Sequence, residues 1–289
     1  MIKDAPEKLR CSPSIGGNSD KYTCYTLEDL TKLKKSWNIR HDDDLILSSE
    51  PKQIWNSLKE RLNNVCNKES CWLRQNFVSS RLGNELLNSF APQQPVSWKK
   101  NPYEWLTTTD IQKVMKQYED AYDDFEFIGP SPIDYDTNVN NACVWPELCD
   151  FNIEEKILNG KKNIGIIFNL DTYNEPGSHW VALYISLNTH EIYYFDSTKI
   201  YKREIPKHIL KFVDSLNSDA ESNFNFKFDF VYNNKIEHQK QNTECGIYCI
   251  YFITQILTNK KIWKDFIDSR IPDAEMKKFR NIFFNKNTI

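Results

Sequence analysis

Cys245 is the first residue whose type and setting suggest chemistry, because it stands in TECGIYCIYF, at the head of a long apolar run. A cysteine attacks as a thiolate, so its pKa must fall from about 8.5 for reaction at neutral pH. A neighbouring histidine or the positive end of a helix lowers that pKa. Thr243 is a plausible N-cap, which would put Cys245 in the first helical turn. We therefore expect Cys245 to be a nucleophile, with Gly246 letting a substrate backbone approach closely. A small buried core residue is the alternative.

A base for this cysteine must come from the five histidines, which are His41, His179, His190, His208 and His238. His179 differs from the other four, because GSHWVALY places it at the start of a predicted strand, behind a loop that contains glycine. A side chain at a strand end can reach a site while the strand holds it rigidly. The other four lie in a charged stretch, beside a turn, on a polar helix face and in a loop. His179 is the candidate general base.

An acid that orients this base is predicted at Asp196, which ends the apolar run in YYFDS. If this run pairs with the strand that begins at His179, across a turn at Asn188-Thr189, the outer strand ends come together. Asp196 would then fix the tautomer and orientation of the imidazole. Read alone, an aspartate at this position is more often a residue that ends a strand in a turn.

Gln239 precedes Cys245 by six residues and is the natural side-chain donor to an oxyanion. It would act together with the backbone N–H of Cys245, and losing one such donor typically lowers the rate ~10² to 10³-fold. The spacing does not exclude Gln241. The four residues in the order His, Asp, Gln, Cys are much less probable by chance than any one of them.

The elements that would position these residues follow from hydrophobic periodicity. The clearest boundary is FAPQQPVSWKKNP, which holds three prolines. It predicts an accessory arm over residues 1–97 and a catalytic domain over 98–289. Helices are expected at 25–37 and 51–65 in the arm and, in the domain, at 107–122, 204–217, 243–257, 262–269 and 273–284. Strands are expected at 163–170, 179–187, 190–197 and 224–230, which gives an α+β fold.

Composition narrows the class of protein further. The net charge is −3, with 40% hydrophobic and 27% charged residues, so no basic surface points to nucleic acid or anionic lipid. No apolar run approaches the ~20 residues of a membrane helix, and MIKDAPEKLR does not resemble a signal peptide. We therefore expect a soluble protein in a reducing compartment, whose eight cysteines are free thiols. No zinc site or other cofactor is expected, since no histidine lies close to the pairs Cys66/Cys71 and Cys143/Cys149.

The segments GSHW, YYFDS and HQKQNTECG together resemble the ubiquitin-like-protein and adenovirus-type proteases, a cysteine-protease clan. The closer match is to the polyprotein-processing proteases of large cytoplasmic DNA viruses, of the African swine fever virus type. Those share TECG, a Gln six residues before the Cys, and a segment similar to FIDSRIPDAEMKKFRNIFF. The resemblance covers residues 98–289 and weakens before them. It implies that His179 is the base, Asp196 the orienting acid, Gln239 the oxyanion donor and Cys245 the nucleophile.

The resemblance also implies a fold and a substrate. The fold would be a papain-like or SUMO-protease-like core, with a central mixed sheet flanked by helices and an N-terminal, mostly helical arm. The activity would be cleavage after Gly-Gly in Gly-Gly-X sites of viral structural polyproteins during virion maturation, in the host cytoplasm (viral factory) and the virion. Trp180 would help form a narrow tunnel that admits only Gly-Gly; packing in the core is the alternative. The swine-fever-type enzyme has Asn where this chain has Asp196.

Other functions remain open at this point. An isopeptidase acting on ubiquitin or a SUMO-like modifier would use the same active site, and an acetyltransferase of this clan would show the same residue order. A chymotrypsin-like cysteine protease would have a strand after its nucleophile, where a helix is expected here. A catalytically dead binding module does not account for four matching residues. Gly16-Gly17 is a candidate self-cleavage site, with a flexible turn as the alternative.

Overall fold

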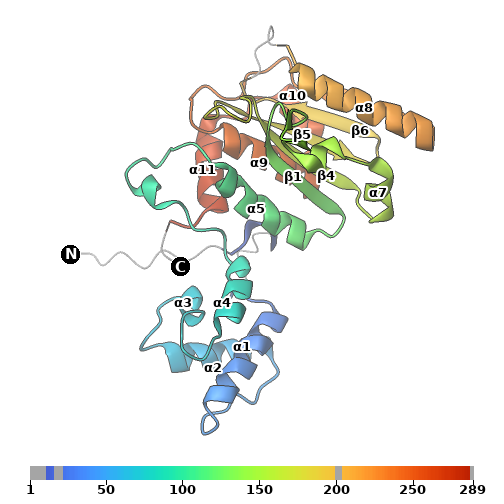
Figure 1. Ribbon diagram of the computed structural model, residues 1–289. Helices are drawn as coiled ribbons and strands as arrows, with labels where there is room; N and C mark the ends of the chain where they lie inside the picture. The colour runs from blue at the N-terminus through green and yellow to red at the C-terminus, as the bar shows by residue number, and fades with distance from the viewer. Residues whose placement is uncertain (1–10, 16–21, 199–203, 287–289) are drawn as a thin grey trace. The chain divides into compact units, whose positions relative to one another are not determined.

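A computed structural model describes residues 11–15, 22–198 and 204–286 of the protein (Figure 1). The chain divides into two compact units. One consists of the described residues of Met1–Pro95 and Asn281–Ile289, and the other of those of Val96–Arg280. The division lies near the proline-rich boundary expected after residue 97, but it groups the end of the chain with the first unit. Gly16-Gly17 lies outside the described residues.

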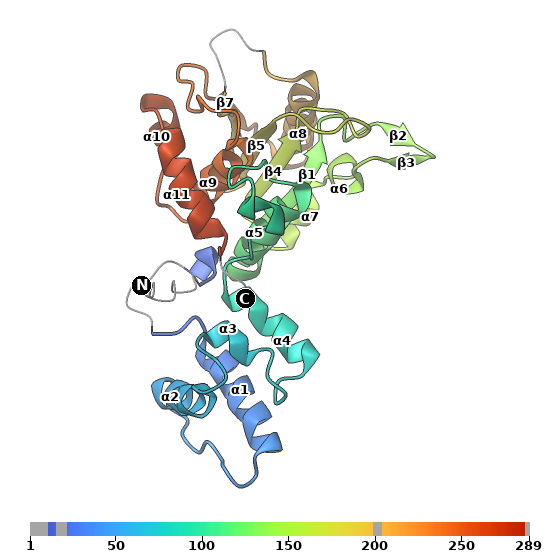
Figure 2. The same ribbon diagram turned by 90° about the vertical axis from the view of Figure 1, so that its left-hand side faces the viewer.

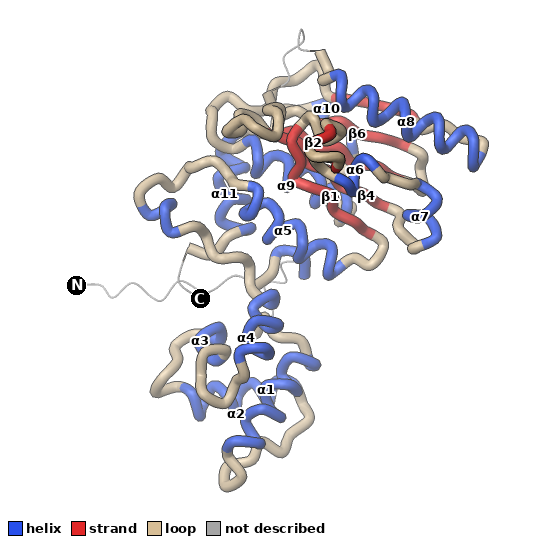
Figure 3. Tube along the Cα trace, in the orientation of Figure 1, coloured by secondary structure: helices blue, strands red, loops and turns tan. Residues whose placement is uncertain are grey.

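The first unit is helical, as expected for the arm, and all the strands in the described residues lie in the second unit (Figure 3). Its helices are α1 (Leu27–Arg40), α2 (Pro51–Leu62), α3 (Glu69–Trp72) and α4 (Ser80–Leu86). Helix α1 begins with a capping box, in which Thr26 and Asp29 each accept the other's backbone N–H. Leu30 and Leu33 of α1 pack with Leu58 of α2 in one buried cluster.

The second unit contains a five-stranded mixed sheet in the order β1-β4-β5-β6-β7. Its strands are β1 (Phe125–Pro132), β4 (Asn163–Asn169), β5 (Trp180–Ser186), β6 (Glu191–Phe195) and β7 (Asp229–Tyr232), and the hairpin β2 (Asn138–Val139)–β3 (Ala142–Cys143) is separate. The helices are α5 (Thr108–Ala121), α6 (Pro146–Cys149), α7 (Ile153–Leu158), α8 (Lys207–Phe224), α9 (Cys245–Leu257), α10 (Trp263–Asp268) and α11 (Asp273–Phe283). Strands β4, β5 and β6 are antiparallel, whereas β1 and β7 join the edges in parallel. The predicted α+β fold with a mixed sheet flanked by helices is confirmed.

Helices cover both faces of this sheet. Figure 2 shows α9, α10 and α11 on one side and α7 and α8 on the other. Every residue of β5 is buried, as expected for a central strand between two helical layers. At Gly165 of β4, an added Cβ would come within 2.9 Å of the Ile253 side chain in α9. Helix α9 is thus pressed against the middle of the sheet, which fixes the position of its first residue.

The structure differs from the predicted strands at two places. The strand predicted at 224–230 begins later than expected, because α8 continues to Phe224 and β7 covers Asp229–Tyr232. The helix extends because Leu216 and Ala220 prolong its buried face, and it ends where Asn225 adopts a left-handed conformation with φ 57°. Strand β1 was not predicted, because its sequence FEFIGPSP contains residues that are rare in strands.

The expectation of eight free thiols is wrong for six of them. Disulfides join Cys11 to Cys24, Cys66 to Cys71 and Cys143 to Cys149, and only Cys245 and Cys249 are free among the described residues. In the three disulfides, in the order given, the two Cα atoms lie 5.0, 5.5 and 6.6 Å apart, within the range that a disulfide spans.

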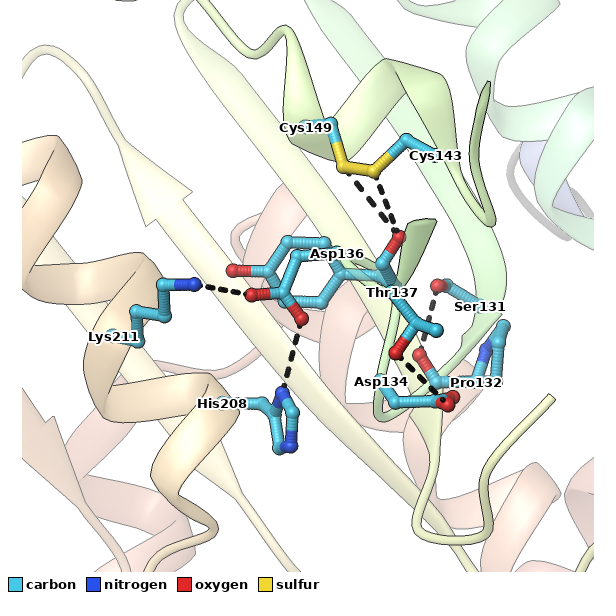
Figure 4. The surroundings of a disulfide bond; sticks show 10 residues. Ser131, Pro132, Asp134, Asp136, Thr137, Cys143, Cys149, His208 and Lys211 are labelled. Carbon is cyan, nitrogen blue, oxygen red and sulfur yellow. Dashed lines mark hydrogen bonds and ion pairs between the residues drawn. A yellow bond between two sulfur atoms is a disulfide. The ribbon is translucent and has the colours of Figure 1, made fainter. Parts of the chain in front are cut away.

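The third disulfide belongs to a polar cluster on the face of the sheet covered by α8 (Figure 4). Both of its sulfur atoms lie near the carbonyl oxygen of Tyr135, at 3.2 and 3.5 Å. The next residue, Asp136, accepts hydrogen bonds from Lys211 at 2.5 Å and from the His208 ring at 3.2 Å. The disulfide therefore joins β3 to the end of α6, beside a segment that Asp136 anchors to α8.

Within 11–15, 22–198 and 204–286, no helix combines the length and apolar character that crossing a membrane requires. The same residues contain no cluster of three or more His, Cys, Asp or Glu side chains arranged to hold a metal ion.

Candidate active site

His179 and Asp196 meet at the ends of two neighbouring antiparallel strands. Strand β5 begins directly after His179 and β6 ends directly before Asp196, and the register pairs Ala182 with Phe195. The Nε2 atom of His179 lies 2.7 Å from Asp196 Oδ1. The Asp196 side chain is 1% exposed and the His179 side chain 12%. The pairing expected from the two apolar runs therefore brings a buried acid to a nearly buried imidazole.

The free thiol Cys245 is the first residue of α9, and it hydrogen-bonds the His179 side chain. Since Nε2 of His179 faces Asp196, Nδ1 is the ring nitrogen that remains for the thiol. Burial of the ring disfavours its charged form, but the hydrogen bonds and charges of Asp196 and Cys245 outweigh this and raise the pKa of His179 to about 9. The imidazole is therefore cationic at neutral pH.

The start of α9 differs from the expected cap. Glu244, not Thr243, is the N-cap residue, and its side chain makes no capping hydrogen bond. Its carboxylate turns instead to Arg280 in α11, whose Nε lies 2.9 Å from Glu244 Oε2. The first N–H groups of any α-helix lack an acceptor within the helix, and Cys245, as the first residue of α9, lies at this positive end.

The Glu244–Arg280 pair is buried and holds the segment before Cys245 in place. The Arg280 side chain is 4% exposed and that of Glu244 is 0% exposed. Burial raises the pKa of Glu244, and the charge of Arg280 opposes that rise. Arg280 also donates to the carbonyl oxygens of Thr243 at 3.2 Å and Glu104 at 2.9 Å. One guanidinium thus joins α11, the segment before Cys245 and the segment before α5.

The loop before His179 is held by its own polar side chains. Asn169 Oδ1 accepts the N–H groups of Asp171 and Ser178, at 3.0 and 3.1 Å. Asp171 accepts the N–H of Gly177 at 3.1 Å and the Ser178 hydroxyl. Gly177 has φ 95°, and a Cβ there would lie 3.0 Å from the Asn169 amide. The glycine is required by this turn, which sets where His179 enters β5.

Asp196 is fixed through its main chain by Asn233, a fully buried residue directly after β7. The Asp196 N–H donates to Asn233 Oδ1 at 2.9 Å, and Asn233 Nδ2 donates to the Asp196 carbonyl at 2.8 Å. Thr198 donates to Asp196 Oδ1 from both its N–H and its hydroxyl, each at 3.0 Å. The carboxylate is therefore oriented from the backbone and from the loop that follows it.

Gln239 is buried in the loop before α9 and is joined to the residue after the acid. Its Oε1 accepts from the Ser197 hydroxyl at 2.7 Å, and its Nε2 lies 2.5 Å from the Gln241 carbonyl oxygen. Gln241 itself is exposed.

His238, which precedes Gln239, is fully buried, and burial lowers its pKa to about 4. Its ring is hydrogen-bonded to the Phe266 carbonyl oxygen and accepts the N–H of Ile271. His238 is thus a neutral residue that anchors this loop.

Trp180 and Gly246 both lie against Leu106, which comes just before α5. The indole N–H of Trp180 donates to the Leu106 carbonyl at 3.0 Å, and the residue is 8% exposed. A Cβ at Gly246 would come within 3.0 Å of the Leu106 side chain, so packing explains the glycine without a substrate. Trp105 next to Leu106 is 40% exposed, and its indole N–H donates to Asn242 O at 2.5 Å.

Sequence reasoning missed Asn233, Arg280, Ser197 and Trp105. A polar pair directly after a strand, as at Asn233, resembles any loop, and only the sheet order shows that β7 lies beside β6. Arg280 stands on an amphipathic helix whose buried face the pattern did not separate from its solvent face. For Trp105, the signal was an aromatic residue just before a capped helix, which is too common to single out a site.

A cysteine beside a histidine–aspartate pair is the arrangement that cysteine proteases use. The catalytic-domain model of the Ulp1 protease family matches residues 99–289, and the chain belongs to this family. A protein of Acanthamoeba polyphaga mimivirus named as a thiol protease is 29% identical, over 92% of this chain and 90% of its own. A cysteine protease of African swine fever virus is 24% identical, over 86% of this chain and 93% of its own. The crystal structure of an African swine fever virus protease superposes with a TM-score of 0.65 at 20% identity, covering 96% of each chain. The chain is thus a Ulp1-type cysteine protease with viral relatives.

Proposed function

We propose that this protease is an endopeptidase that cleaves after Gly-Gly in Gly-Gly-X sites of viral structural polyproteins during virion maturation. The observation that supports this most is the chain of contacts from Cys245, the first residue of α9, to His179 and from His179 to Asp196. These contacts hold the imidazole in its cationic form. The viral origin of the relatives and their coverage along almost the whole chain support a viral setting. The host cytoplasm and the virion are the proposed places of action.

The proposed chemistry is acyl transfer through a thioester. The Cys245 thiolate attacks the carbonyl carbon of the second glycine, and the carbonyl electron pair moves onto oxygen. Gln239 Nε2 and the N–H of Cys245 stabilise this oxyanion. As the intermediate collapses, the C–N bond breaks and the leaving amine takes the proton of His179. Water then attacks the thioester while His179 takes its proton, and the thiolate leaves as the acid product is released.

Trp180 and Trp105 are the proposed substrate contacts. They flank Leu106, and both indole N–H groups are engaged with carbonyl oxygens, so their rings are held in fixed orientations. Rigid aromatic walls suit an extended segment without side chains, because any Cβ in a narrow passage would clash. Gly246 was expected to admit substrate; its packing against Leu106 makes it part of the support for this wall.

Cleavage of a peptide library bearing Gly-Gly-X tests the proposal. The wild-type protein is expected to release products that end in Gly-Gly, and the Cys245→Ala variant none. A Cys249→Ala variant is the matched control, because Cys249 lies one turn further along α9 and is fully buried. Cleavage that survives Cys245→Ala, or that ignores the glycines, would contradict the proposal.

An isopeptidase acting on a ubiquitin-like modifier is the second candidate. It is favoured by the family and by the name of a relative, the SUMO-1 cysteine protease of African swine fever virus, which is 23% identical. Vinyl-sulfone probes built on ubiquitin or on SUMO distinguish the two. Under the isopeptidase function they label Cys245 faster than a Gly-Gly peptide probe does, whereas a polyprotein endopeptidase reacts with the peptide probe alone.

An acetyltransferase, which the clan also includes, would transfer label from acetyl-CoA to protein. Incubation with labelled acetyl-CoA checks this, and the endopeptidase proposal predicts no stable transfer.

A further inference from the structure

Ser197 stands directly after the candidate acid Asp196 and is completely buried. Its carbonyl oxygen accepts the N–H groups of His238 at 3.0 Å and Gln239 at 2.8 Å. Its hydroxyl lies 2.7 Å from Gln239 Oε1. Three hydrogen bonds thus join one serine to the loop of the candidate oxyanion donor.

These contacts leave the Gln239 amide a single satisfactory orientation. The carbonyl oxygen of Gln241 can only accept, so the amide atom 2.5 Å from it must be the donor Nε2. The atom that faces Ser197 is then Oε1, which can only accept, and the serine hydroxyl must donate to it. A flipped amide would place two oxygen acceptors against each other in a buried site, which is costly.

Resting on the proposed role of Gln239, we propose that Ser197 is a positioning residue that holds the Gln239 amide with Nε2 toward the oxyanion. Nε2 carries two hydrogens, of which one bonds the Gln241 carbonyl and the second serves the developing charge. Because Asp196 and Ser197 are consecutive, the same short segment orients the imidazole and the oxyanion donor. A preorganised donor of this kind stabilises the transition state more than the bound substrate.

The proposal predicts a distinctive pattern for Ser197→Ala. Removing the hydroxyl leaves the Gln239 amide held only through Nε2, so the donor is less firmly positioned and kcat falls about tenfold, as expected for one lost hydrogen bond. KM stays the same, because the oxyanion exists only beyond the substrate complex. Alkylation of Cys245 by iodoacetamide keeps its rate, because this reaction forms no oxyanion at that position and depends on the thiolate and His179 alone.

The test is a two-by-two cycle of Ser197→Ala and Gln239→Ala, assayed with a Gly-Gly peptide bearing a fluorescent amine as leaving group. Rates are expressed per Cys245 that iodoacetamide can titrate, so loss of folded protein does not enter them. Ser131→Ala is the matched control, because Ser131 is 1% exposed and its hydroxyl also donates to a carbonyl, that of Pro132 at 3.0 Å. It is expected to leave kcat unchanged.

The cycle separates this inference from the function on which it rests. Gln239→Ala should lower kcat about 10² to 10³-fold, and Ser197→Ala should have no further effect in that background. A tenfold loss that persists in the Gln239→Ala background, or a slower alkylation of Cys245, overturns the role of Ser197. An unchanged kcat in Gln239→Ala overturns the oxyanion role of Gln239 itself.

Discussion

The Nε2 atom of His179 lies 2.7 Å from Asp196 Oδ1, and the carboxylate is almost completely buried. Because Cys245 bonds the same ring, the imidazole lies between a buried acid and a thiol. Burial alone would lower the pKa of His179, yet these two partners raise it to about 9. Of the two partners, Asp196 orients the ring and stabilises its charge.

Asp196→Asn separates these two roles. The wild-type kcat/KM should fall as the pH rises through about 9, because His179 then loses its proton. Asparagine keeps an acceptor for Nε2 but removes the negative charge, so the pKa of His179 falls and the alkaline limb moves to lower pH. Activity at neutral pH should decrease roughly tenfold. The pH profile of kcat/KM checks this. An alkaline limb that does not move would show that the Asp196 charge does not stabilise the imidazolium.

Asn233→Ala should make the position of the Asp196 carboxylate less fixed. The side chain makes two hydrogen bonds to the Asp196 main chain, and the variant loses both of them inside a buried site. The free energy of unfolding should fall by about 1–3 kcal/mol, and kcat should fall with it. Urea titration followed by tryptophan fluorescence measures the change. The neighbouring Asn234→Ala serves as control, and equal losses in the two variants would contradict the role of Asn233.

Arg280→Met should be among the most destabilising single changes in the catalytic unit. It leaves the fully buried Glu244 carboxylate without its partner, which typically costs about 3–5 kcal/mol. Adding Glu244→Gln removes the unpaired charge, so the double variant should be more stable than Arg280→Met alone. The control is Lys278→Met, whose pair with Glu275 is exposed and is worth at most about 1 kcal/mol. Additive effects in the unfolding free energies would contradict a coupled pair.

The cysteines give a prediction that mass spectrometry can check. In denatured protein kept free of reductant, iodoacetamide should modify Cys245 and Cys249 but none of the six cysteines that form disulfides. In the folded protein only Cys245 should react, because Cys249 is fully buried and burial raises its pKa well above the ordinary value. Alkylation of Cys143 or Cys149 before reduction would contradict the third disulfide.

Local patterns were sufficient to predict much of this molecule. Short runs of apolar residues predicted β4, β5 and β6. The turn between β5 and β6 made it possible to predict that His179 and Asp196 lie close together. The helix predicted at 107–122 is present as α5 (Thr108–Ala121). These predictions succeed because the partners are close in sequence, so period and turn chemistry determine their pairing.

Long-range relationships could not be predicted in the same way. The two hydrogen bonds from the Asn233 side chain to Asp196 depend on the parallel pairing of β7 with β6. The Glu244–Arg280 pair joins residues 36 positions apart. Strand β1 pairs in parallel with β4 despite a sequence rich in poor strand formers, because burial between helices outweighs intrinsic propensity. The disulfides likewise depend on folded geometry, which the spacing of cysteines does not reveal.

The central claim is that Cys245, activated by His179, is the nucleophile for Gly-Gly substrates. The most direct test treats the protein with a peptide that ends in Gly-Gly vinyl sulfone and locates the adduct by peptide mass mapping. We predict one adduct, on Cys245, whose rate of formation falls at least about 10²-fold in His179→Ala. An adduct on another residue, or labelling that is indifferent to His179, would contradict the account.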